Sequence, residues 1–257
     1  MTPREKWVAF VTILLREVRR FLRIWPQTLL PPAITITLYF LIFGALIGPR
    51  IGPMAGVSYI EFVAPGLIMM SIITNTYGNV VSSFYGAKFG RSVEELLVSP
   101  VPNWIILTGF VAGGVARGLA VGAIATVLSL FFARLSLSHA GIVLAMVLLT
   151  AVLFSLAGFI NAVFARSFDD ISIIPTFVLT PLTYLGGVFY SVELLPDFWR
   201  TLSHLNPILY MINTFRYGVL GVSDVPVGVA FALVGVFVVA LYAYSLYLLR
   251  TSKGLRS

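Results

Sequence analysis

The chain has 257 residues, of which 59% are hydrophobic and 11% are charged, and its mean hydropathy is +0.98. A soluble domain carries about 25% charged residues, so this composition excludes a water-soluble globular domain and a disordered polar chain. The chain contains no cysteine, which excludes disulfides, thiolate metal sites and cysteine nucleophiles. The net charge of +7 would suit a nucleic-acid partner, but its distribution indicates membrane orientation instead, and we expect no nucleic acid to bind.

The N-terminal residues 1–25 predict an amphipathic helix. From Trp7 to Trp25, apolar side chains recur at steps of three and four residues. Four arginines fall on the opposite face: Arg16, Arg19, Arg20 and Arg23. This pattern is typical of a helix lying in the cytoplasmic leaflet. It is either a plain membrane anchor or an element that also contacts a partner.

Six stretches are long and apolar enough to cross a bilayer, which requires about 20 residues of helix. They are residues 28–47, 62–83, 104–132, 140–165, 171–190 and 225–249. Five contain no charged residue, and the third contains Arg117. The sequence therefore predicts an all-α integral membrane protein with six transmembrane helices in a single domain, residues 1–257.

Lysines and arginines near the ends of the spans predict the orientation. The side that would hold both termini carries Arg4, Lys6, Arg16, Arg19, Arg20, Arg23, Lys88, Arg91, Arg166, Arg250, Lys253 and Arg256. The other side carries only Arg50, Arg134, Arg200 and Arg216. This excess places both termini in the cytoplasm of a multi-pass protein of the bacterial inner, or plasma, membrane.

The second span carries a polar stripe, and the third is rich in glycine. The stripe consists of Ser71, Thr74, Asn75, Gly78, Asn79 and Ser82. It would either join helices or line a path through the membrane. In the third span, Gly109 and Gly113 are four residues apart, as are Gly114, Gly118 and Gly122. This spacing allows close helix approach.

The cytoplasmic segment 84–103 predicts a short helix. Ser92 followed by Glu95 is a capping-box pattern, so the helix should begin near Ser92. Pro100 and Pro102 should end it. Such a helix would either pack on the spans or be held by a soluble subunit, and the spacing alone does not decide between the two.

Arg117 would lie at mid-depth in the third span. On insertion scales, a charge there costs about 2.5–3.5 kcal/mol, so we expect a partner. That partner is a carbonyl, a polar side chain, a lipid phosphate or a transported anion. Alternatively, residues 103–116 form an interfacial helix and the span begins later, which would bring Arg117 near a headgroup.

The outer segment 191–224 is too apolar to remain in water, although loops this long are uncommon and often functional. We interpret it as two short re-entrant helices in the outer leaflet. They should separate near Asn206 and Pro207, because proline restricts the residue before it.

Enzymatic motifs are missing from the sequence. None of the three lysines stands in the Gly-Lys-Ser/Thr context of a P-loop. His139 and His204 each stand alone near predicted outer span ends. We therefore expect no catalytic residue, no metal and no cofactor bound by this chain.

Several runs resemble the ABC-2 type transporter permease family. Residues 181–190 (PLTYLGGVFY), 195–196 (LP), 206–210 (NPILY) and 216–218 (RYG) are similar to that family's C-terminal signature. Residues 91–100 (RSVEELLVSP) are similar to its cytoplasmic loop between the second and third spans. Together with the six spans and the N-terminal helix, the resemblance covers nearly the whole chain.

The resemblance implies the membrane subunit of an ATP-driven exporter, which forms a homodimer in the lipid bilayer. ATP and Mg²⁺ would be bound by a separate cytoplasmic ATPase subunit. The implied ATPase-docking residues are Arg16, Arg19, Arg20, Arg23, Arg91, Ser92, Glu94, Glu95, Leu96 and Leu97. Candidate residues of the substrate path are Asn75, Asn79, Arg117, Phe189 and Tyr190.

The cargo classes implied by the resemblance are lipids, glycolipids, polysaccharides and drug-like amphiphiles. An alternative is a secondary transporter or channel driven by an ion gradient. Such proteins often carry acidic residues or broken helices at the midplane, whereas every acid here lies outside the predicted spans. A third alternative is a membrane scaffold that transports nothing.

Overall fold

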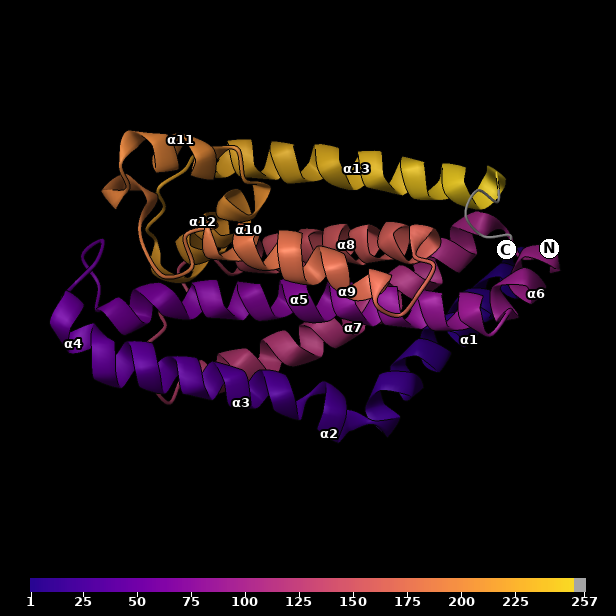
Figure 1. The fold of residues 1–257 in the computed structure, drawn as a ribbon, viewed down its shortest axis with the longest axis horizontal. Coiled ribbons are helices and arrows are strands. Elements are labelled where there is room, and N and C mark those ends of the chain that lie inside the picture. The colour runs from indigo at the N-terminus through magenta and orange to yellow at the C-terminus, as the bar shows by residue number, and fades with distance from the viewer. Residues whose placement is uncertain (252–257) are drawn as a thin grey trace.

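The computed structural model describes residues 1–251, and this part of the chain is helical apart from short connections and one isolated bridge between Met54 and Val57. Lys253 and Arg256, which contributed to the predicted orientation, lie outside the described residues. Most of the long helices run side by side along the long axis of the molecule (Figure 1). The beginning of α1, helix α6 and the described end of α13 lie at the same end of this bundle (Figure 1).

Five helices in the described part are long and apolar enough to cross a membrane. The first, Trp25–Ile51, consists of α2 (Trp25–Thr28), α3 (Leu30–Tyr39), the π-helical η1 (Phe40–Ile47) and α4 (Gly48–Ile51). The others are α5 (Tyr59–Phe89), α7 (Asn103–Ser129), α8 (Ala140–Phe164) and α13 (Val227–Thr251).

Helix α5 extends beyond the predicted stretch 62–83 at both ends. At its start, the Ser58 N–H donates to the Glu61 carboxylate at 3.1 Å, which caps the helix. Glu61 therefore lies inside the helix, although the sequence pattern placed every acid outside the spans. At the other end α5 continues to Phe89, so the connection to α7 is shorter than the predicted segment 84–103.

The predicted fifth span, residues 171–190, is replaced by a shorter helical rod. Its pieces are α9 (Asp170–Ile174), the π-helical η2 (Pro175–Leu179) and α10 (Thr180–Tyr184), each of five residues. At 1.5 Å per residue this rod is about 22 Å long, against a hydrocarbon thickness of about 30 Å. The helix ends before Gly187, whose φ of +74° lies in the left-handed region that glycine tolerates.

The segment 191–224, predicted to lie on the outer side, contains η3 (Val192–Leu194), α11 (Asp197–His204) and α12 (Pro207–Leu220). The break falls at Leu205 and Asn206, close to the predicted position. Asn206 explains it, because its side-chain oxygen accepts from the Ile208 N–H at 3.0 Å and caps α12. Its side-chain amide donates to the Leu182 carbonyl at 2.5 Å, which ties the break to α10.

Arg216 of α12 is buried and joins three separate segments. Its Nε donates to the Phe62 carbonyl of α5 at 3.2 Å, and its Nη2 donates to the Gly187 carbonyl at 2.7 Å. Its Nη1 donates to the Asn213 side chain at 3.1 Å. The guanidinium carbon lies 3.8 Å from the centre of the Phe62 ring, a cation–π contact. These contacts satisfy a charge that would otherwise be costly to bury.

Helix α7 presents glycine on two faces. On one face, a Cβ at Gly109 would lie 2.6 Å from Cγ2 of Ile13, and a Cβ at Gly113 would meet the side chain of Glu17. Both of these neighbours belong to α1 (Pro3–Arg23). On the other face, Gly114, Gly118 and Gly122 lie against Val80, Thr76 and Ile72 of α5. The two glycine series in the sequence therefore serve two different neighbours.

Glu17 of α1 is only 1% exposed, and the sequence pattern gave no reason to expect this. Arg16 and Arg20 pair with its carboxylate at 3.3 Å each, and the Ser83 hydroxyl of α5 donates a hydrogen bond to it. The face of α1 that packs on the bundle therefore contains Glu17 between Ile13 and Phe21. Trp7, Leu15 and Leu22 of the predicted apolar face are exposed instead.

We expect Gly158→Ala to destabilise the bundle. A Cβ at Gly158 of α8 would lie 2.6 Å from the Tyr77 carbonyl oxygen of α5, and backbone cannot rotate away. Overpacking of this kind costs about 1–3 kcal/mol, so the thermal midpoint in detergent should fall by several degrees. Gly78→Ala is the matched control, because nothing lies within 4 Å of a Cβ there. Equal midpoints for the two variants would contradict the close contact.

Glu17→Ala should loosen α1. The substitution leaves the Ser83 hydroxyl, Arg16 and Arg20 without their carboxylate acceptor. Because the two arginine side chains are 45% and 30% exposed, water compensates part of their charge, and we expect a cost of about 1–3 kcal/mol. Thermal unfolding and the rate of tryptic cleavage within α1 would measure the effect. Arg19→Lys, at an exposed position on the same helix, keeps the trypsin site and should leave both close to the wild type. Resistance of Glu17→Ala to trypsin at the wild-type level would rule out this role for Glu17.

Candidate functional site

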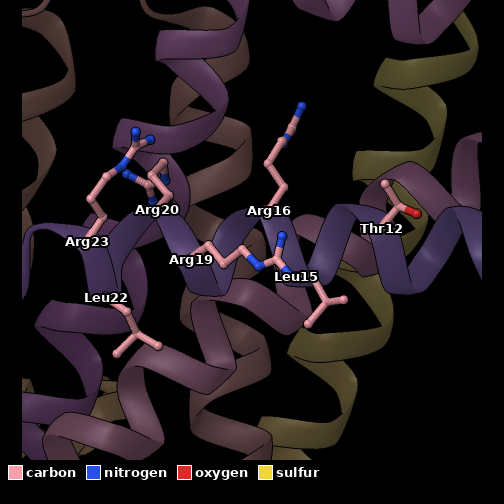
Figure 2. Close-up of a pocket in the computed structure, with 7 residues that line it drawn as sticks. All are labelled: Thr12, Leu15, Arg16, Arg19, Arg20, Leu22 and Arg23. Carbon is pink, nitrogen blue, oxygen red and sulfur yellow. The ribbon is translucent and has the colours of Figure 1, made fainter.

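The first candidate surface is an open groove of about 960 Å³ along α1. We call it the α1 arginine surface, and it is lined by Thr12, Leu15, Arg16, Arg19, Arg20, Leu22 and Arg23. In Figure 2, Arg16, Arg20 and Arg23 extend to one side of the helix, whereas Leu15 and Leu22 extend to the other. All four arginines predicted from the helical periodicity therefore line one surface.

The four arginines are not equivalent. The Arg20 Nη2 atom donates to the backbone carbonyl of Asn79 at 3.0 Å and to its side-chain oxygen at 2.8 Å. These bonds hold the Arg20 side chain against α5. The Arg16 guanidinium carbon lies 5.2 Å from the centre of the Phe110 ring of α7. Arg16, Arg19 and Arg23 are all exposed. Because Arg16 is also paired with Glu17, a partner that binds this surface would find Arg19 and Arg23 less engaged within the chain.

The second candidate surface is the short helix α6 (Ser92–Val98). It begins at the predicted residue but for a different reason, because Arg91 is the N-cap, in the left-handed conformation with φ 59°. The Ser92 hydroxyl donates to the Ala87 carbonyl at 3.1 Å instead of forming the predicted capping box. The chain thus reverses at Gly90 and Arg91 directly after α5.

Helix α6 separates a packed side from an exposed side. Val93 is buried, and Leu96 and Leu97 pack partly against the core. Glu94 and Glu95 are exposed. Two apolar residues near the ends of the helix are exposed, Val98 at 88% and Phe89 at 69%. The sequence pattern did not single out either of them. The exposed side of α6 is therefore acidic, with an apolar residue at each end.

Two of the predicted path residues meet inside the bundle. The Arg117 Nη2 atom donates to the Asn75 side-chain oxygen at 3.2 Å and to the Thr28 carbonyl at 3.4 Å. The partners of Arg117 are thus an amide and a carbonyl. A cavity of about 300 Å³ lies beside them, bordered by α2, α3, α5 and α7. Helix α7 is continuous through Arg117, so residues 103–116 do not form a separate interfacial helix.

The other predicted path residues lie apart from this cavity. Asn79 is occupied by Arg20. Phe189 belongs to an aromatic cluster, with ring centres 4.5 Å from Phe43 and 5.8 Å from Tyr39. Tyr190 packs against a small cluster that contains Val192, Leu209 and Val225. The structure therefore does not assemble all five residues into one site.

The comparisons with known proteins agree with this architecture. Residues 8–220 match the family described as ABC-2 type transporter. The chain is 62% identical over 252 residues to the inner membrane transport permease YadH of Escherichia coli K12, and the match covers 98% of each chain. It is 27% identical over 218 residues to nodulation protein J of Rhizobium meliloti, which covers 83% of this chain and 82% of that protein.

A match of this extent covers the N-terminal helix from Val8, α6, the long helices up to α8, and α12. The relative from Escherichia coli is named as a transport permease of the inner membrane. The chain belongs to the ABC-2 type transporter family.

Proposed function

We propose that this chain is the permease subunit of an ATP-driven exporter and that it works as a homodimer with a separate cytoplasmic ATPase. The family and the permease name of a close relative support a membrane transport role. One observation carries the proposal further. The chain has no P-loop, yet α6 and the beginning of α1 lie at one end of the bundle with charged residues exposed on both (Figure 1).

The two surfaces suit a soluble partner with both signs of charge. The α1 arginine surface, in the second half of α1, offers Arg19 and Arg23, and α6 offers Glu94 and Glu95, so a partner that binds both must extend along α1. An ATPase that binds both would need acidic groups opposite α1 and basic groups opposite α6. Because α6 follows α5 after a sharp reversal at Arg91, motion of a subunit bound there would pass directly into α5.

In this proposal the N-terminal and C-terminal ends are cytoplasmic, and α1 lies at the membrane surface. The rod from Asp170 to Tyr184, extended by the turn that follows, crosses the membrane as the fifth span along the chain and brings the number of crossings to six. Helices α11 and α12 re-enter the outer leaflet and close the path. The cargo is a lipid, glycolipid, polysaccharide or drug-like amphiphile that enters from the cytoplasm or the inner leaflet. Alternating access would be driven by ATP binding at the partner subunits.

The test of this function is reconstitution. Purification of the tagged chain in mild detergent should retain an ATPase subunit. Vesicles that contain both proteins should hydrolyse ATP faster than the ATPase alone, and the stimulation should require this chain. Cargo movement by this chain in vesicles without an ATPase would overturn the proposal in favour of an ion-driven transporter or channel. Intact purification with no associated or stimulated ATPase would favour a scaffold.

Reversing the charge of α6 should weaken ATPase docking. In the double variant Glu94→Lys, Glu95→Lys, we expect roughly tenfold weaker association and a matching loss of ATPase stimulation, because opposite charges at the contact become like charges. Both residues are exposed, so the thermal midpoint should not change. Glu193→Lys is the matched control, since this exposed acid lies in η3 of the outer segment. Normal assembly and stimulation in the double variant would exclude α6 as the docking element.

Val98→Asp is a second probe of the same contact. At 88% exposure this side chain has nothing to pack against within the chain, whereas Leu96 packs partly against the core and its replacement would disturb the fold. We expect Val98→Asp to reduce co-purification of the ATPase and to leave the thermal midpoint unchanged. Val98→Ala, which shortens the side chain without adding charge, should lie between this variant and the wild type. Unchanged co-purification of Val98→Asp would show that this residue lies outside the contact.

A further inference from the structure

Arg117 is a mostly buried cation that no described carboxylate neutralises. Both ion pairs in the described part of the chain belong to Glu17, and neither involves Arg117. Its two hydrogen bonds go to neutral acceptors and use Nη2 alone. Its Nε is buried without a hydrogen-bond partner. A guanidinium has five N–H donors, and leaving a buried donor unpaired costs free energy. The site therefore lacks an acceptor.

Arg117 borders a cavity that could hold such an acceptor. Arg117 and Asn75 line the cavity of about 300 Å³, together with the polar side chains of Gln27 and Thr74 and with apolar side chains such as Ile36 and Leu67. Ligand pockets range from about 300 to 1,000 Å³, so this cavity suits a compact group and not a complete lipid. The lining combines a cation and amide groups with apolar walls.

The surrounding charges also favour an anion. Along one face of α5, Asn75, Asn79 and Ser83 follow one another at steps of four residues, and they contact Arg117, Arg20 and Glu17 respectively. Arg16 also pairs with this glutamate. This polar ladder thus contains three guanidiniums and a single carboxylate. A surplus of positive charge in a partly buried region attracts a negative ligand.

We infer that Arg117 and Asn75 form a binding site for a phosphate-bearing anion. Arginine binds phosphate oxygens through its planar array of N–H donors, and neither the Nε nor the Nη1 of Arg117 donates a hydrogen bond within the described residues. The phosphate comes either from the headgroup of an anionic lipid or from a free phosphate ion. The inference concerns binding and not translocation, so it can fail while the proposed transport function holds, and the reverse is also true.

The test uses the full-length protein in neutral detergent, without any ATPase. Its thermal midpoint is measured against rising concentrations of dihexanoylphosphatidylglycerol, dihexanoylphosphatidylcholine and inorganic phosphate. We expect the anionic lipid to raise the wild-type midpoint by several degrees, because a ligand that binds only the folded state stabilises it. In Arg117→Gln, the affinity derived from this titration should fall about tenfold or more.

Asn75→Asp is a second variant that tests the same site independently. It places a carboxylate beside Arg117 without changing the size of the side chain. We expect this variant to have a higher midpoint than the wild type in the absence of ligand and to respond weakly to the anionic lipid. The Asn75→Asp titration still tests the site if Arg117→Gln does not fold. Asn103→Asp adds the same charge at the start of α7 and should respond like the wild type.

The outcomes separate the two sources of phosphate. A response to phosphatidylglycerol that both site variants lose, with inorganic phosphate inert, identifies a lipid headgroup. A response to inorganic phosphate that both variants lose identifies the free ion. The inference is overturned if neither anion raises the wild-type midpoint, if phosphatidylcholine is as effective as phosphatidylglycerol, or if the response survives in Asn75→Asp.

Discussion

Glycine on two faces of α7 lets α1 and α5 approach the same helix closely enough for their polar side chains to meet. In lipid there is no hydrophobic driving force between helices, so close packing and interhelical hydrogen bonds hold them together. Gly113 makes room for Glu17, and Gly118 makes room for Thr76. The contacts of Glu17 with Ser83, of Arg20 with Asn79 and of Arg117 with Asn75 all depend on this proximity.

The sequence predicted those features that depend on local chemistry. Long apolar runs identified the span Trp25–Ile51 and the helices α5, α7, α8 and α13, because lipid requires a helix of sufficient length with its backbone bonds satisfied internally. The end of α6 followed from the two prolines after it, and the break before α12 followed from Asn206 and Pro207. The start of α6 was predicted at the right residue, although Arg91 and not a Ser92 capping box begins the helix. In each case the signal lies within a few residues of the feature it predicts.

Features that depend on contacts between distant residues could not be predicted in this way. Glu17 stands among arginines in the sequence of an amphipathic helix, and its burial depends on the space that Gly113 of α7 leaves for it. Arg20 turns toward Asn79 because α5 passes beside α1. The rod around Pro175 and Pro181 is shorter than its apolar run because the chain turns at Gly187, where its carbonyl meets Arg216.

Arg216 has a mechanical consequence. It joins α12 to α5 through the Phe62 carbonyl and ring, and to the turn after α10 through the Gly187 carbonyl. A tilt of α5 that preserves these bonds must carry α12 and this turn with it as one rigid unit. A force applied at the far end of α5, where the chain turns into α6, would reach this unit through a single helix, whose interior proline, Pro65, lies three residues from the Phe62 contact.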